Sequence, residues 1–104
     1  MIEVRKTRLF EDWFVSLRDQ QARLRVQVRI DRLAFGNPGQ HRVLTGGVCE
    51  MKIDHGPGYR VYFGKDGATI AILLGGGTKK RQQRDIEAAR ARWADYRWRK
   101  RSAR

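Results

Sequence analysis

The feature that most constrains this sequence is an almost wholly apolar run at residues 68–74, which is bounded by turn residues on both sides. The tight turn Lys65-Asp66-Gly67 precedes the run, and three consecutive glycines at residues 75–77 follow it. An apolar run of this length without polar alternation is typical of a strand that is buried on both faces. We therefore expect a sheet in which residues 68–74 form a central strand that ends at the glycines.

Two segments before this run alternate between apolar and polar residues, as strands with one buried face do. They are residues 48–54 and residues 59–64, and the turn residues 55–58 separate them. This spacing predicts a β-hairpin. The alternation of Ile2 and Val4 with charged neighbours predicts a further short strand near the N-terminus.

Three other segments carry apolar residues at the spacing of one helix face. Residues 10–17 and residues 20–35 form the first two, and a glycine-rich break follows at residues 36–39, so that together they predict a helical hairpin. The third begins after Thr78, the expected N-cap. Residues 97–104 lose the apolar pattern, which predicts a frayed basic tail.

The expected element order is therefore β-α-α-β-β-β-α within a single domain spanning residues 1–104. The fold class that follows is α+β, with a small, mostly antiparallel sheet, an N-terminal helical hairpin and a C-terminal helix. We expect the helices to pack on one face of the sheet.

The charge of the chain indicates the class of its partners. Lysine and arginine number 23 against 11 acidic residues, so the formal net charge is +12. Residues 78–104 hold eleven basic and three acidic residues, a net of +8. Nucleic acid, an acidic protein segment and an anionic membrane surface could each account for this excess, and the first two can both apply.

Cysteine and histidine are scarce, which bears on compartment and metals. Cys49 is the one cysteine, so no intrachain disulfide can form, as suits a reducing cytosol. No apolar run reaches the length of about 18 residues that a membrane span needs, and the first residues lack a signal-peptide pattern. A cytoplasmic protein with no metal, no cofactor and no membrane association is expected.

Two groups of side chains are candidates for a binding site. The strand alternation places Glu50, Lys52, Arg60 and Tyr62 on one sheet face, where cations can hold phosphate and a phenol can stack on a base. An ordinary solvated face with a cross-strand ion pair is the alternative. His55 lies in the neighbouring turn, and it is either a general acid or base near this face or a simple turn residue.

The second group is a basic run directly after the glycines: Lys79, Lys80, Arg81 and Arg84. If these cations open a helix, they oppose its macrodipole, which suggests a counter-anion such as phosphate. A solvated basic face is the alternative.

Residues 47–52, 56–63 and 73–79, followed by Gln82 and Asp85-Ile86, carry a recognisable pattern. It resembles the HigB-like "addiction module killer protein" branch of the RelE/ParE toxin superfamily. The resemblance covers about residues 47–86, and the amphipathic segment at residues 10–17 gives it weaker support.

This resemblance implies a RelE-like microbial RNase fold and the toxin of a type II toxin–antitoxin pair. The cognate antitoxin would be of helix-turn-helix type with an acidic segment, and operator DNA would be contacted only through the complex. RelE-like members are mRNA interferases, endoribonucleases that cut mRNA in the ribosomal A site without a metal, by attack of the ribose 2′-hydroxyl on the adjacent phosphate.

The resemblance also implies roles for single residues. Arg60 stands at the central arginine and would stabilise the phosphate, with Lys79 as a second phosphate contact or proton donor. Lys52 keeps the charge of a position that is more often arginine but lacks the planar fork, and Tyr62 would stack on a base. The remaining candidates are the RNA-binding residues Lys80, Arg81, Gln82, Arg84 and His55, and the supporting residues Glu50 and Asp85.

Two alternatives to the nuclease stay open, because one fold can serve several functions. One is a ParE-like poison of DNA gyrase, and the other is a non-toxic nucleic-acid-binding relative. The set Lys52, Arg60 and Lys79 favours the nuclease over the gyrase poison, which needs no convergent phosphate site.

Overall fold

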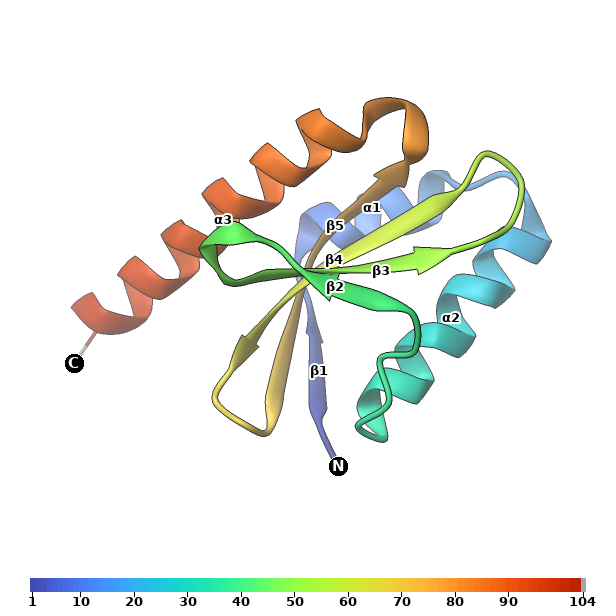
Figure 1. Cartoon of the computed structure of the whole chain (residues 1–104). Helices are drawn as coiled ribbons and strands as arrows, with labels where there is room; N and C mark the ends of the chain where they lie inside the picture. The colour runs from blue at the N-terminus through green and yellow to red at the C-terminus, as the bar shows by residue number, and fades with distance from the viewer. Residues whose placement is uncertain (104) are drawn as a thin grey trace.

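A mixed five-stranded sheet organises the chain, with β5 (Ile70–Thr78) at its interior and strand order β1-β5-β4-β3-β2 (Figure 1). This computed structural model describes residues 1–103. The remaining elements of that part of the chain are β1 (Glu3–Lys6), α1 (Arg8–Ser16), α2 (Gln20–Ala34), β2 (His41–Val43), the 3-10 turn η1 (Thr45–Gly47), β3 (Val48–Ile53), β4 (Tyr59–Asp66), the 3-10 turn η2 (Lys79–Arg81) and α3 (Gln82–Ser102).

The sheet pairing confirms the α+β class and the central strand. β5 pairs in parallel with β1 and antiparallel with β4, while β3 pairs antiparallel with both β4 and β2. Ala71 and Leu73 of β5 belong to one apolar cluster, and Ile72 and Leu74 belong to the other. The strand is therefore buried on both faces, as its lack of alternation predicts.

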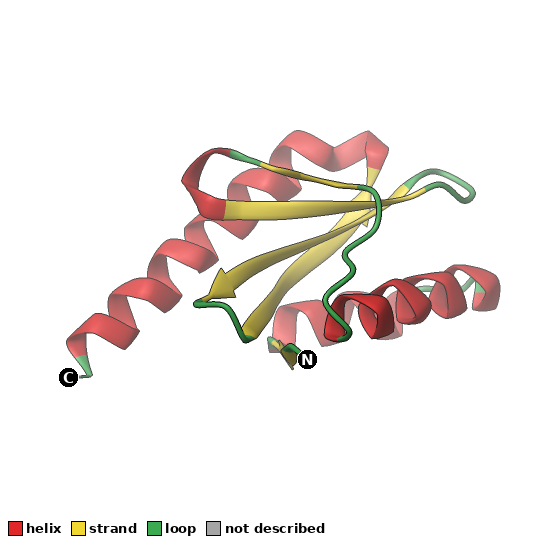
Figure 2. Cartoon of the chain, turned by 60° about the horizontal axis from the view of Figure 1, so that its bottom comes forward, coloured by secondary structure: helices red, strands yellow, loops and turns green. Residues whose placement is uncertain are grey.

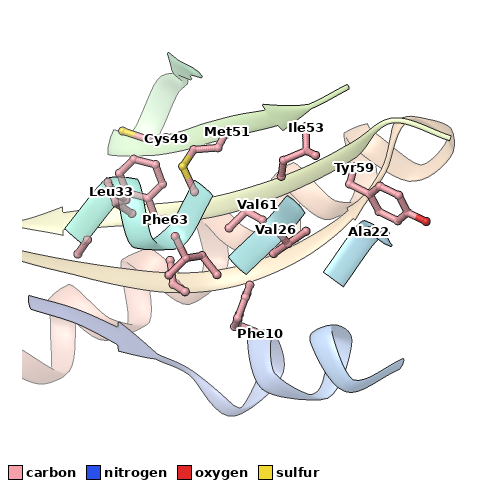
Figure 3. Close-up of a cluster of buried hydrophobic side chains, with 13 residues drawn as sticks. Phe10, Ala22, Val26, Leu33, Cys49, Met51, Ile53, Tyr59, Val61 and Phe63 are labelled. Carbon is pink, nitrogen blue, oxygen red and sulfur yellow. The ribbon is translucent and has the colours of Figure 1, made fainter. Parts of the chain in front are cut away.

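The helices cover both faces of the sheet, so the expectation that they pack on one face is wrong. Figure 2 shows the sheet between the α1–α2 pair and α3. The larger cluster joins α1 and α2 to the sheet through residues such as Phe10, Val26 and Phe63 (Figure 3). The smaller cluster joins Ile86 and Trp93 of α3 to the opposite face. Each of the two faces presents apolar side chains, and burial of both requires two layers of helix.

The glycine triplet does not end β5, which continues to Thr78. A side chain at Gly76 would collide with the ring of Trp13, and one at Gly77 would collide with the carboxylate of Asp85. The glycines therefore let a helix of each layer approach the strand closely, and this use of glycine does not interrupt the pairing.

We expect Gly76→Ala to lower the free energy of unfolding by about 1–3 kcal/mol, because the added methyl group must displace the ring of Trp13. Urea denaturation of the variant measures the loss. The same substitution in a Trp13→Leu background should cost less, since the smaller side chain leaves room. An equal cost in both backgrounds would show that the ring is not the obstacle.

Strand β2 was not predicted, and it is held by tertiary contacts. It pairs with β3 in the register His41↔Met51, Arg42↔Glu50 and Val43↔Cys49. The α2 residue Arg29 fixes the loop before it: Nη1 donates to the carbonyl of Lys52 at 2.5 Å, and Nη2 donates to the carbonyls of Pro38 at 2.9 Å and Gln40 at 2.8 Å. Three exposed residues are too few to show a sequence period.

Helix α3 differs from expectation at both ends. Thr78 makes no side-chain cap, and the turn η2 separates it from the helix, which begins at Gln82. The expected frayed tail is instead helical through Ser102. Asp66, at the end of β4, anchors this part, since it accepts hydrogen bonds from the Tyr96 hydroxyl at 2.6 Å and the Lys100 ammonium at 2.5 Å. The last residue of the expected tail lies outside the described residues.

Candidate functional site

A cleft of about 460 Å³ opens on the α3 side of the sheet beside β2, β3 and β4. We call it the Arg60 cleft, and its lining includes Gln40, Arg42, Glu50, Lys52, Arg60 and Gln82. The register Glu50↔Tyr62 and Lys52↔Arg60 confirms that the four predicted residues of β3 and β4 share one face. The cleft lining therefore holds three cations, Arg42, Lys52 and Arg60, and the carboxylate of Glu50.

Arg60 is held almost entirely below the surface, with 5% of its area exposed. Its Nη1 donates to the carbonyl oxygen of Gly58 at 2.9 Å, and the backbone N–H of Lys79 donates to the same oxygen at 2.9 Å. Gly58 has φ +79°, and a side chain there would lie 2.9 Å from Nη1 of Arg60. A glycine is therefore needed at this turn, which brings the start of η2 beside Arg60.

The Nε–H of Arg60 is buried and has no hydrogen-bond partner within residues 1–103. A buried donor without a partner is costly, by about 1–3 kcal/mol. Solvent does not reach this atom, so an anion in the cleft would meet the cleft-facing part of Arg60 together with Arg42 and Lys52.

Glu50 connects three elements of the cleft. Its carboxylate accepts from Nε of Arg42 on β2 at 2.7 Å and from Nε2 of Gln82 on α3 at 3.0 Å. Only 4% of the residue is exposed. Burial raises the pKa of this carboxyl, but the hydrogen bonds from Arg42 and Gln82 outweigh it and the net pKa is lowered. Glu50 is therefore ionised at neutral pH, and its carboxylate links β3 to β2 and α3.

Arg42 is a site residue that sequence reasoning missed. Its guanidinium is largely exposed, and its partner is the buried carboxylate of Glu50. Only the β2–β3 register places the two residues opposite each other. The signal in the sequence was a single arginine in a segment expected to be a loop, and nothing there indicated the pairing.

The predicted stacking role of Tyr62 is wrong, because α3 covers this residue. Tyr62 is 1% exposed and belongs to the apolar cluster with Ile86 and Trp93. Burial and the neighbouring Glu50 carboxylate raise the pKa of its phenol well above the usual range. The ring is a core residue and cannot meet a base.

Of the two roles considered for His55, an acid or base near the polar face and a turn residue, the structure supports the turn residue. Its Nε2 lies 3.0 Å from Oδ2 of Asp19, the N-cap of α2, and its ring stacks against Tyr59 on the α1–α2 side of the sheet. The hydrogen bond from His55 lowers the pKa of the Asp19 carboxyl. His55 therefore fastens the β3–β4 turn to the start of α2.

The basic run after β5 lies on either side of the lining residue Gln82 in the chain but does not itself line the cleft. Lys79, Lys80, Arg81 and Arg84 are all exposed, and the first three form η2. Lys79 is the nearest to Arg60, through their shared contact with Gly58. The four cations thus form a charged rim at the start of α3.

Asp85 closes the strand side of this rim. Its carboxylate packs on Gly77, the β5 residue opposite Arg60 in the register. Burial raises the pKa of this carboxyl, against the opposing effects of Arg84 and Arg81. Asp85 thus joins the first turn of α3 to β5.

Neither a cluster of metal-ligating side chains nor a membrane-crossing helix is found within residues 1–103. Across residues 1–103, no three His, Cys, Asp or Glu side chains lie close enough to form a metal site. In the same range, no helix combines the length and apolar character that a membrane crossing requires. Cys49 is buried, and burial raises the pKa of its thiol.

The arrangement is suited to holding an anion. Arg42, Lys52 and Arg60 supply three positive charges against the one negative charge of Glu50, a net of +2 in the cleft. Both carboxylate oxygens of Glu50 are already engaged by donors. The cleft can therefore neutralise a phosphate, whereas proton abstraction by Glu50 would require it to leave its partners.

No family model matches the chain. A protein of Haemophilus influenzae, described as uncharacterized, is 38% identical over 89 residues, which cover 86% of this chain and 90% of the relative. An identity of this size over nearly the whole of both chains shows that this chain belongs to the same family as that Haemophilus influenzae protein.

Proposed function

We propose that the chain is the toxin of a type II toxin–antitoxin pair, a ribosome-dependent, metal-independent mRNA endonuclease that inhibits translation in the cytoplasm. The observation that carries the proposal is the Arg60 cleft, where a buried guanidinium with an unpartnered Nε–H shares a small space with two more cations. The resemblance to the HigB-like branch of the RelE/ParE superfamily supports it, because Arg60 stands at the central arginine of that pattern.

The fold is consistent with a RelE-like microbial RNase. An N-terminal strand and helical hairpin precede an antiparallel run of strands, and a C-terminal helix follows. This order agrees with that architecture, and the Arg60 cleft is lined by residues of β2, β3, β4 and the start of α3. Fold alone does not assign an activity, so the proposal depends on the cleft.

The proposed reaction is transesterification within RNA. The ribose 2′-oxygen attacks the adjacent phosphorus and loses its proton to a base, while the bond from phosphorus to the 5′-oxygen breaks and that oxygen takes a proton. The products are a 2′,3′-cyclic phosphate and a 5′-hydroxyl. Arg60 would stabilise the charge that develops on the phosphoryl oxygens, an effect worth about 3–4 kcal/mol for a well-placed donor.

The other residues would act around that step. Lys52 faces Arg60 across the strand pair and would hold the phosphate as a point charge. Lys79 at the rim would contact a neighbouring phosphate or donate a proton. Glu50, Gln82 and Asp85 would position the cations and the start of α3.

The proposed partners follow from charge. The rim formed by Lys79, Lys80, Arg81 and Arg84 is exposed and would attract mRNA and ribosomal RNA. An acidic segment of a cognate antitoxin would compete for the same surface and cover the cleft. Complementary charge chiefly speeds such an association and directs the partner to the site.

A nucleic-acid-binding relative that does not cut RNA is the second candidate. Tyr62 is buried and His55 lies against Asp19, so neither predicted side chain is in the cleft. Their positions remove one candidate for base stacking and one for proton transfer. Phosphate binding by Arg60 and Lys52 would remain, and cleavage assays separate the two candidates.

We expect cleavage to require translating ribosomes. The carboxylate of Glu50 is engaged by Arg42 and Gln82, so a substrate already bent for in-line attack would have to supply much of the barrier reduction. Primer extension on mRNA from cells expressing the chain should show cuts within translated frames and none in a matched transcript without a start codon. Efficient cutting of purified RNA would contradict ribosome dependence, and uncut mRNA in growth-arrested cells would overturn the nuclease.

A further inference from the structure

A second hollow of about 450 Å³ lies beside α2. We call it the α2 groove, and its lining includes Leu24, Arg25, Val28, Arg32, Gln40 and Lys52. Gln40 and Lys52 also line the Arg60 cleft. The two hollows therefore meet at the end of β3, and together they follow the edge of the sheet from the α3 side to the outer face of α2.

The wall of the α2 groove combines apolar and cationic side chains. Leu24 and Val28 are one turn apart, and they are 59% and 46% exposed. Arg25 and Arg32 are exposed on the same wall, seven residues or about 10 Å apart along the helix. Leu24 precedes Arg25 and Val28 lies between Arg25 and Arg32, so a ligand with both charged and apolar parts would contact all four side chains.

Arg29 makes the junction between the hollows rigid. Its guanidinium bonds to the carbonyl of Lys52 on one side and to those of Pro38 and Gln40 on the other. The charge of Arg29 is therefore committed to the backbone, and it fixes the two residues that both hollows share. Arg25 and Arg32 remain as the cations that the α2 groove presents to a ligand.

We infer that the α2 groove binds the part of an RNA strand that extends beyond the Arg60 cleft. The inference rests on the proposed function, which places an RNA phosphate at Arg60. A strand that passes over Lys52 and Gln40 enters the α2 groove directly, because the hollows share those residues. Arg25 and Arg32 then contact successive parts of the phosphate backbone, and Leu24 and Val28 contact sugars and bases.

The test measures RNA binding and does not depend on cleavage. The probe is a fluorescent RNA of about twelve nucleotides with 2′-O-methyl groups, which cannot undergo 2′-hydroxyl attack, and a trinucleotide of the same chemistry is the short probe. Anisotropy gives the affinity at several salt concentrations for the parent, for Arg25→Gln/Arg32→Gln, and for Arg23→Gln. Arg23 is the matched control because it lies on α2 but outside the α2 groove lining.

The double variant should bind the long probe about tenfold more weakly at low salt. Its log–log salt slope should be shallower by about 1.4, since each phosphate contact to a single strand contributes about 0.7. The trinucleotide should bind both proteins equally, and Arg23→Gln should match the parent. Circular dichroism and a thermal melt verify that the variants are folded.

An unchanged affinity and salt slope for the double variant would overturn the inference. The same result is expected if the α2 groove binds an acidic protein segment and not RNA. That outcome would leave the proposed function standing if Arg60→Ala weakened binding of both probes. If the parent binds neither probe, both the inference and the proposed function are overturned. If the double variant loses binding of the long probe while Arg60→Ala binds normally, the result supports RNA binding by the α2 groove and contradicts the role assigned to Arg60.

Discussion

Arg60→Ala is expected to abolish the growth arrest that this chain causes when it is expressed alone in a bacterial host. The substitution removes the one guanidinium that lies buried in the cleft, with 5% of its area exposed and its Nε–H unpartnered in the described residues. Loss of one preorganised donor to a developing oxyanion slows the chemical step by about a hundred- to a thousandfold. Colony counts after induction, and primer extension on a reporter mRNA, measure the effect.

Arg60→Lys and Arg8→Ala are the matched controls. Lysine keeps the charge but loses the planar fork and the bond geometry to Gly58, so partial toxicity is expected. Arg8 is an exposed arginine on α1 that lines neither the Arg60 cleft nor the α2 groove, so its removal should leave toxicity nearly intact. Since Arg60 is buried, a thermal melt must show that the alanine variant is folded. A folded Arg60→Ala protein with full toxicity would refute the assignment of Arg60.

Local sequence patterns predicted the strands and helices that are long enough to show a regular spacing of apolar residues. The unbroken apolar run of β5, the alternation in β3 and β4, and the helical spacing in α2 each specify a structure by the face that must be buried. The same alternation placed Lys52 and Arg60 on one face, and the strand register sets them opposite each other at the candidate site.

Features that depend on contacts across the fold were not predictable in this way. The three residues of β2 are exposed, and their pairing with β3 relies on the loop that Arg29 holds. Without β2 there was no reason to place Arg42 opposite Glu50. An interaction between residues distant along the chain leaves no period in the sequence.

Tyr62 was misassigned because the sequence does not show which helix covers which face of the sheet. Alternation shows that Tyr62 shares a face with Arg60, but it does not show which part of that face a helix covers. The spacing of Ile86 and Trp93 predicts a buried helix face without stating the sheet face against which it packs. Because α3 crosses to the side opposite α1 and α2, Tyr62 became core while Arg60 stayed at a cleft.

The last prediction concerns Glu50, whose carboxylate joins β3 to Arg42 and Gln82. Glu50→Gln should lower the free energy of unfolding at neutral pH by about 2 kcal/mol, less than for a fully buried ion pair because the guanidinium of Arg42 is 58% exposed. The folded pKa of this carboxyl is lowered from its ordinary value. The stabilisation is therefore fully present above the unfolded pKa of about 4.3, and it is lost as the pH falls through the folded pKa.

Urea denaturation at neutral pH and at successively lower pH measures this dependence. The difference in stability between the parent and Glu50→Gln should shrink as the pH falls below about 4. The carboxyl of the parent is then neutralised, first in the unfolded chain and at lower pH in the folded protein, so the parent loses the charge that the variant lacks. Asp95→Asn is the matched control, since Asp95 is an exposed carboxylate that is also paired with an arginine, Arg99, at 3.0 Å. Its effect on stability should be small at every pH, as for most exposed ion pairs. If the loss in free energy of unfolding caused by Glu50→Gln is the same at every pH, the shape and packing of the side chain stabilise the fold at this position. The negative charge that holds Arg42 and Gln82 would then contribute nothing to stability.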